Sequence, residues 1–227
     1  MADPADIDAS MGDVDAVTPD GQVPIDASAD TAVPLNPVAV WSARDGMPDT
    51  ACAPWTISKY PTMGVPVLAD GTLTISTSAD GEDVAYAQGA EVLQDSRPFV
   101  MEARVKFVAG ATSHAARSGA TLAFFLGGAA NALMIHDGEV ALLAGPQVKG
   151  PTHAVPTTDA FHDYRIEANL DSKAIAVWRD QQLVLFGQLY ADNSSRQIIF
   201  GDTTGAAHAT SEWQRVSHNA HVPVACP

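Results

Sequence analysis

The chain has 227 residues, with 12 basic against 27 acidic residues and a formal net charge of −15 at pH 7. This length suffices for one large domain with a substantial core. The acidic charge would repel a phosphate backbone, which argues against nucleic acid as a partner. No apolar run approaches the ~20 residues of a membrane-spanning helix, and the N-terminus MADPADIDAS lacks the pattern of a secretory signal. We therefore expect either a cytoplasmic protein or a mature chain whose export signal has been removed.

The first segment, residues 1–37, holds eight Asp and no Lys, Arg or aromatic residue, so it contributes −8 of the net charge. Such a composition cannot bury enough apolar surface to offset the entropy lost on ordering. DIDASMGD alternates like an EF-hand loop, but its glycine falls at the seventh position instead of the sixth and no Glu closes it. We expect a disordered acidic linker at 1–37 and one folded domain at 38–227.

From residue 38 onward, short β-rich runs alternate with clusters of Gly, Asp, Asn and Pro. Asp-Gly pairs at 70–71, 80–81 and 137–138 are typical of tight turns between strands. The predicted strands cover residues 38–42, 71–77, 82–88, 99–108, 120–127, 131–136, 139–144, 161–170, 173–179, 182–188, 197–202 and 212–218. No stretch keeps a helical period. The pattern predicts an all-β sandwich or barrel.

The two cysteines, Cys52 and Cys226, lie near the two ends of the predicted domain. Because chain ends are often close together in a compact domain, a disulfide is geometrically reasonable. In the chain-entropy model, a loop of this length gives on the order of 5 kcal/mol. The alternative is two unrelated buried thiols. A disulfide favours a secreted, periplasmic or cell-surface protein.

Several segments, in this order along the chain, resemble a known family. WSARDGMPDTACAPWT (41–56), FHDYRIEANLDSKAIAVWRDQQLV (161–184) and IIFGDTTGAAHATSEWQRVSHN (198–219) are similar to concanavalin A-like lectin/glucanase domains. The likeness is greatest to the laminin-G-like and sialidase-associated modules of exported bacterial proteins. It spans residues 38–227 and implies an antiparallel two-sheet jelly-roll sandwich. Relatives include carbohydrate-binding modules, adhesins, glycoside hydrolases and polysaccharide lyases, so this fold does not settle function.

The glucanase branch of that family carries E-x-D-x-x-E or E-x-D-x-E on one strand, which sets two carboxylates at the spacing that glycoside hydrolysis needs. No predicted strand has this pattern, and Glu82 and Asp83 point to opposite faces. G-x-S-x-G and H-E-x-x-H are also absent. These absences disfavour the known enzymatic site. An enzyme with an unfamiliar site would need two converging carboxylates or a Tyr/His/Arg cluster in a groove.

Calcium is the one cofactor that the resemblance implies, because many relatives close an oxygen-lined site with S-x-W-D. Here the matching stretch is SEWQ, with Gln214 in place of the aspartate. Glutamine offers a carbonyl oxygen but no charge, which weakens a site for a hard cation. Asp202 or Asp45 could compensate. The alternative for each is a turn aspartate that caps its own backbone.

Alternation along the stretch 161–170 separates two kinds of side chain. His162 and Tyr164 share the mostly apolar face, so we expect a hydrogen-bonded core histidine there instead of a catalytic base. Arg165 and Glu167 share the opposite face. This outward pair is therefore the candidate for ligand contact.

FVMEARVKF (99–107) splits in the same way, with Glu102 and Arg104 pointing outward. If the two strands are neighbours, Glu102, Arg104, Arg165 and Glu167 form a cross-strand charge ladder worth only ~0.2–1 kcal/mol per pair. On a convex sheet this ladder is a soluble surface. On a concave sheet it is a polar floor for a ligand.

Sugar recognition usually needs aromatic faces beside polar groups, and three aromatic residues are candidates. Trp55 follows CAP and Tyr60 stands in a Pro-containing loop, so both are expected on an exposed rim. Trp178 precedes the RDQQ turn and could face either way. Trp213, in the closing SEWQ, is expected in the core.

The sequence therefore favours a non-catalytic carbohydrate-binding or adhesive module of an exported or cell-surface protein. We expect a monomer with a polysaccharide or glycan as its partner. The acidic N-terminal segment resembles the spacer after the lipidated cysteine of bacterial surface lipoproteins, although that cysteine is not in this chain. A glycoside hydrolase or polysaccharide lyase, and a structural protein-interaction module, remain as alternatives.

Overall fold

A computed structural model describes residues 39–60, 65–77, 82–110, 119–203 and 208–220. All of them belong to the compact unit Val33–Pro227. Their regular structure is almost entirely β-strand, together with the short 3-10 helix η1 (Pro48–Thr50). No helix of this described part is long and apolar enough to cross a membrane. The linker predicted at 1–37 lies outside the described residues and stays a prediction.

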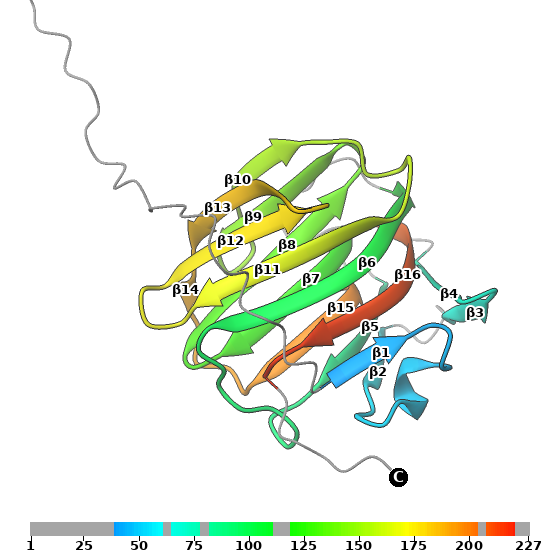
Figure 1. The fold of residues 1–227 in the computed structure, drawn as a ribbon, viewed down its shortest axis with the longest axis horizontal. Coiled ribbons are helices and arrows are strands. Elements are labelled where there is room, and N and C mark those ends of the chain that lie inside the picture. Colours follow the sequence, from blue (N-terminus) through cyan, green and yellow to red (C-terminus); the bar gives the residue numbers. More distant parts are fainter. Residues whose placement is uncertain (1–38, 61–64, 78–81, 111–118, 204–207, 221–227) are drawn as a thin grey trace, which may run out of the picture. The chain divides into compact units, whose positions relative to one another are not determined.

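The first sheet has the strand order β13-β12-β11-β6-β16-β4-β3, with β1 also paired to β16. All of its pairings are antiparallel. Its strands are β1 (Ala39–Ser42), β3 (Val67–Ala69), β4 (Thr72–Ser76), β6 (Phe99–Gly110), β11 (His162–Asn169), β12 (Ala174–Arg179), β13 (Gln182–Gln188) and β16 (Ala209–His218). Strands far apart in the sequence thus lie side by side, as β6 does with both β11 and β16 (Figure 1).

The second sheet has the strand order β10-β9-β8-β7-β15-β5-β2, with β14 also paired to β8. Its pairings are antiparallel as well. Its strands are β2 (Thr56–Tyr60), β5 (Asp83–Gln88), β7 (Ala120–Leu126), β8 (Ala129–His136), β9 (Glu139–Gly145), β10 (Val148–Ala154), β14 (Tyr190–Ala191) and β15 (Gln197–Asp202). The two sheets lie one behind the other as the layers of a sandwich, which confirms the predicted fold (Figure 1).

Every strand predicted from the sequence is present, with ends displaced by a few residues at most. The sequence missed β2, β3, β10 and β14. The first three of these are the outermost strands of their sheets, and β14 is only two residues long. An outermost strand packs weakly, so it needs no apolar alternation: β10 is exposed along most of its length and contains Gly150 and Pro151.

The core between the sheets is built around Phe200 of β15. Its ring stacks on Trp41 and Tyr86 at centroid distances of 5.5 and 5.4 Å, and Trp55 meets it edge-on at 5.0 Å. Trp213 of the first sheet lies 5.1 Å from the same ring, and its predicted core position is confirmed. Such aromatic contacts add to the large apolar area that each ring buries.

Buried polar side chains link the two sheets inside the sandwich. His218 of β16 shares a hydrogen bond of 2.7 Å with Gln88 Oε1 of β5, and the Gln88 amide donates to the Ala53 carbonyl at 2.8 Å. Thr77 donates to the buried Asp202 carboxylate at 2.5 Å. A buried polar atom costs free energy unless it is paired, so these bonds fix how the layers align.

Candidate functional site

The outer face of the first sheet, turned away from the core, carries the charged side chains that the alternation predicted. β11 pairs with β6 so that Arg165 lies opposite Glu102, and Asp163 lies opposite Arg104. His162, Tyr164, Ile166 and Ala168 are buried while the residues between them are not, which confirms the predicted split. Directly opposed residues on one face are close enough for their side chains to interact.

Arg165 is the centre of the ladder. Its Nη1 donates to Glu102 Oε1 and its Nε donates to Glu167 Oε1, both at 2.6 Å. The three side chains are only 19–25 % exposed. Burial acts to lower the pKa of Arg165, but the two hydrogen bonds and the two negative charges raise it overall. The guanidinium is therefore held as a cation between β6 and β11, as the predicted charge ladder implies.

Arg104, the fourth predicted member of the ladder, has different partners. Its Nη1 donates to Asp163 Oδ2 at 2.8 Å and its Nε donates to Gln214 Oε1 at 2.9 Å. Arg215 Nη2 donates to the other oxygen of Asp163 at 3.0 Å. A register shift in β16 between Trp213 and Arg215 makes room for Gln214 beside Arg215 on this face.

These side chains line a pocket of about 390 Å³ on the outer face of the first sheet. Its lining residues come from the end of β1 and the turn after it, the β3–β4 turn and strands β6, β11 and β16. They are Ser42, Arg44, Gly71, Arg104, Asp163, Gln214 and Arg215. Three arginine side chains thus face one carboxylate in this site, which we call the arginine pocket.

On the other side of the ladder, the same face becomes apolar. Trp178 of β12 lies opposite Arg165 and is half-buried. Next to it on β13, Leu183 and Phe186 are 54 % and 44 % exposed. The outer face therefore runs from an apolar end with Trp178, through the Arg165 ladder, to the arginine pocket. This combination of an aromatic ring with fixed donors and acceptors is typical of sites that orient a small polar ligand.

The other two aromatic candidates turn out differently. Trp55 is 1 % exposed, so the predicted exposed rim is wrong for this residue. Its backbone N–H bonds to Pro48 O after the η1 turn, and its ring packs against Phe200 and His218. Tyr60 is the last residue of β2, and its side chain lies outside the described part of the structure.

The three predicted calcium ligands lie in different settings. Asp202 is buried in the core and accepts the Thr77 hydroxyl, Gln214 lines the outer pocket, and Asp45 is exposed in a turn. In the described part of the chain, no group of three His, Cys, Asp or Glu side chains is placed to hold a metal ion. Calcium binding stays a prediction. So does the Cys52–Cys226 disulfide, because Cys226 lies outside the described residues.

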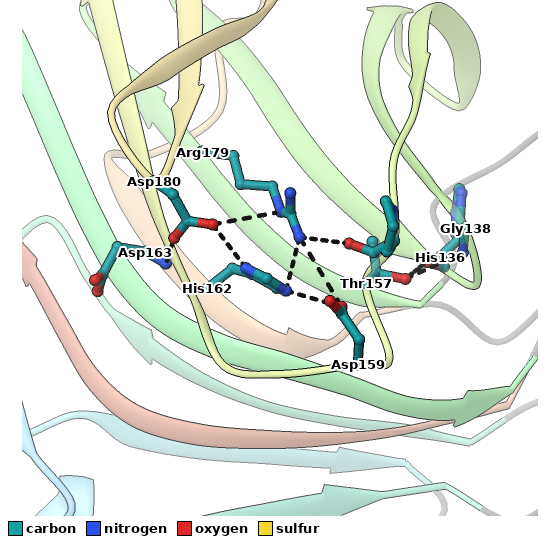
Figure 2. Close-up of polar contacts among 9 residues, drawn as sticks. His136, Gly138, Thr157, Asp159, His162, Asp163, Arg179 and Asp180 are labelled. Atoms are coloured by element: carbon teal, nitrogen blue, oxygen red, sulfur yellow. Dashed lines mark hydrogen bonds and ion pairs between the residues drawn. The ribbon is translucent and has the colours of Figure 1, made fainter.

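A second polar cluster surrounds His162 at the start of β11 (Figure 2). Its Nδ1 lies 2.7 Å from Asp180 Oδ2, and its Nε2 lies 3.0 Å from Asp159 Oδ1 and 2.7 Å from Arg179 Nη2. The neutral ring can donate from Nδ1 to Asp180 and accept from Arg179, while a protonated ring donates to both carboxylates. The hydrogen bond with His162 is the main cause that holds the pKa of Asp159 below its ordinary value.

His162, Tyr164 and Arg179 together form the residue set that a lyase would use, but their burial does not suit that role. Tyr164 is 1 % exposed. Burial raises the pKa of its phenol to about 12, and the Arg179 guanidinium offsets part of that rise. A phenol shut away from solvent cannot exchange a proton with a bound polymer. His162 itself is 8 % exposed and its ring is hydrogen-bonded, as the sequence predicted.

Sequence reasoning missed the partners that complete both clusters. Asp163, Arg44 and Arg215 carried no functional signal in the sequence. They meet Arg104 only through a turn, a register shift and strand pairing across the chain. Asp180 and Arg179 belong to the RDQQ turn, which could be recognised as a turn but not as a neighbour of His162.

No protein-family model matches the chain, and no curated protein matches it either. Solved structures do match. One described as a sialidase is 12% identical with a TM-score of 0.57, and the match covers 82% of this chain but only 19% of that one. Cellulose induced protein Cip1 is 13% identical with a TM-score of 0.56, covering 83% and 100%. The carbohydrate esterase vb_24B_21 from Shiga toxin-encoding bacteriophage phi24B is 12% identical with a TM-score of 0.56, also covering 83% and 100%.

At these identities the likeness concerns the fold. The chain shares a two-sheet antiparallel sandwich fold with these structures, as the jelly roll implied by the resemblance in the sequence requires. It spans about a fifth of the length of the sialidase that it matches.

Proposed function

We propose that the chain is a non-catalytic carbohydrate-binding module whose ligand lies on the outer face of the first sheet. The observation that carries this proposal is Trp178 standing beside the fixed Arg165 and Glu102 pair on that face. An indole offers a flat apolar surface to a sugar ring, and the charged groups can hydrogen-bond its hydroxyls. The fold shared with proteins described as a sialidase and a carbohydrate esterase supports a carbohydrate ligand.

Binding without turnover fits the carboxylates on this face better than hydrolysis does. A glycosidase needs one carboxyl group that delivers a proton and a second that attacks or activates water. Glu102 and Glu167 are instead hydrogen-bonded to the same guanidinium. They hold Arg165 in place, and neither is positioned as a proton donor.

We also propose that the protein acts outside the cytoplasm, as an exported or cell-surface adhesive module. The disulfide predicted between Cys52 and Cys226 supports this location, because disulfides persist in oxidising compartments. Ellman titration of the denatured, unreduced protein tests it: no free thiol is expected, and two free thiols would contradict the disulfide.

Glycan-array binding combined with a polysaccharide-degradation screen tests the function. We expect binding without turnover, and Trp178→Ala should weaken binding about 10-fold or more, as for a central aromatic contact. Val148→Ala is the matched control, since this residue is 54 % exposed on an edge strand of the second sheet.

Two results would overturn this assignment. Turnover that is abolished by Glu102→Ala or Arg165→Ala, in variants that still unfold cooperatively, would make the chain a glycoside hydrolase or lyase. Binding to a protein but to no saccharide would favour the interaction module.

A further inference from the structure

The pocket at the β6 and β16 end of the outer face concentrates positive charge on a strongly acidic protein. Arg44, Arg104 and Arg215 line it together with a single carboxylate, Asp163. The chain as a whole carries −15. Three of its 12 basic residues thus converge on one concave site of about 390 Å³, a size typical of small-molecule sites.

Two of these guanidiniums are held in place before any ligand arrives. Asp163 accepts Arg104 through one oxygen and Arg215 through the other, and Gln214 accepts the Nε of Arg104. Each guanidinium has five N–H donors, and these bonds use only two from Arg104 and one from Arg215. The side chains are 38 % and 49 % exposed, so the remaining donors are accessible. Donors fixed in advance lose less entropy on binding.

The third cation, Arg44, borders the pocket from a different side. It is exposed, and its backbone N–H bonds to the hydroxyl of Ser42 at 3.2 Å. Its side chain passes the tight β3–β4 turn, where a Cβ on Gly71 would lie 3.4 Å from Arg44 Cγ. Gly71 has φ +69°, a conformation that favours glycine. The glycine therefore leaves the space beside the Arg44 side chain free of another side chain.

We propose that this pocket binds the anionic substituent of an acidic saccharide, a carboxylate or a sulfate ester, while the rest of the sugar chain lies toward Trp178. The inference rests on the carbohydrate-binding function proposed above and names its ligand class. Guanidinium groups bind planar or tetrahedral oxyanions through paired N–H bonds, which a neutral sugar cannot accept with the same strength. The net negative charge of the protein repels polyanions at long range, so the preference arises from contact in the pocket.

Isothermal titration of the full chain with matched oligosaccharides tests the proposal. The probes are oligogalacturonate, alginate and hyaluronan oligosaccharides, each beside its methyl ester, which removes the charge and keeps the sugar. A sulfated carrageenan oligosaccharide beside its desulfated form is a separate arm. We expect at least one acidic probe to bind about 10-fold more tightly than its neutral form, because hydrogen bonds to a charged oxyanion are stronger than those to a neutral group.

Two variants test whether the preference for the acidic probe arises in this pocket. Arg44→Gln breaks no ion pair seen in the described structure and should reduce the preference about fivefold, while Arg215→Gln should reduce it at least as much. Lys106→Gln, which removes an outward cation of β6 that does not line the pocket, is the matched control and should leave it unchanged. Carboxylated and sulfated probes tell which oxyanion the pocket takes.

Equal affinity for acidic and neutral forms, with binding still lost in Trp178→Ala, would overturn the acidic ligand and leave the carbohydrate-binding function standing. Equal loss in Lys106→Gln and Arg44→Gln would also overturn it, because the effect would then be one of overall charge. Failure of every probe, charged and neutral, together with an empty glycan array, would overturn both proposals.

Discussion

His162 joins the β12–β13 turn to the segment that leads into β11. Its ring meets Asp180 from the β12–β13 turn and Asp159 from the segment before β11, and Arg179 also bonds the Pro156 carbonyl. Two residues from Asp159, Thr157 donates to His136 O and accepts the Gly138 N–H of the second sheet, so that the same segment bridges the layers (Figure 2). His162 thus holds, through Asp159, a segment that Thr157 attaches to the second sheet.

His162→Ala should lower the free energy of unfolding by about 1–3 kcal/mol, because it removes a buried ring that Arg179 and two half-exposed aspartates share. Urea unfolding at pH 7 measures this change. His153→Ala, on an exposed position of β10, is the control and should stay within about 0.5 kcal/mol of the unchanged protein. Equal stability of the two variants would contradict a structural role for His162.

Strand β6 connects the charge ladder with the arginine pocket because it lies between β11 and β16. Its inward residues are buried, while Glu102 and Arg104 reach Arg165 on one neighbour and Gln214 on the other. One strand thus contributes to both the ladder and the arginine pocket. A change of one residue in its register would turn these groups into the core.

Arg165→Gln should cost about 1–2 kcal/mol of unfolding free energy, because two ion pairs are lost and two carboxylates then face each other uncompensated. Adding Glu102→Gln to this variant should restore part of the loss by removing one of the carboxylates. Chemical denaturation of the single and double variants at low salt measures this coupling. Strictly additive losses would show that Arg165 does not join the two strands.

Carboxylates that are bound to cations link the stability of the whole domain to pH. The hydrogen bond from Arg196 is the main cause that holds the pKa of Asp95 below its ordinary value. Burial would raise the pKa of Asp180, but hydrogen bonds from the Asp163 backbone and from His162 outweigh it and lower it. A carboxyl with a lowered native pKa stabilises the fold above its unfolded pKa, about 4, and this stabilisation disappears as the pH falls through the native value.

We therefore expect the free energy of unfolding to decline from about pH 5 downward. Asp95→Asn, which has no carboxyl to protonate, should be less stable at pH 7 and lose less stability between pH 5 and 3. Thermal unfolding across this range measures both slopes. Asp137→Asn, in an exposed turn, is the control and should keep the slope of the unchanged protein. Parallel slopes for all three proteins would contradict the role of Asp95.

The alternation of side chains was enough to predict the central strands and their faces. It correctly placed Glu102, Arg104, Arg165 and Glu167 on one outer surface, because a strand turns every second side chain the same way. The expectation for Trp55 was based on the preceding Cys-Ala-Pro instead of alternation, and it was wrong because the η1 turn directs this side chain into the core. The alternation also missed β2, β3 and β10, three of the four outermost strands, since such strands need no apolar alternation.

The sequence by itself determined the all-β class, the core-facing residues and which charged groups point outward, since these follow from local periodicity. Only the tertiary structure decided that Arg44, Arg104 and Arg215 share one pocket and that Trp178 stands beside Arg165. The physical reason is that pairing between strands far apart in the chain, together with the register shift in β16, brings these residues together. No local pattern encodes such neighbours.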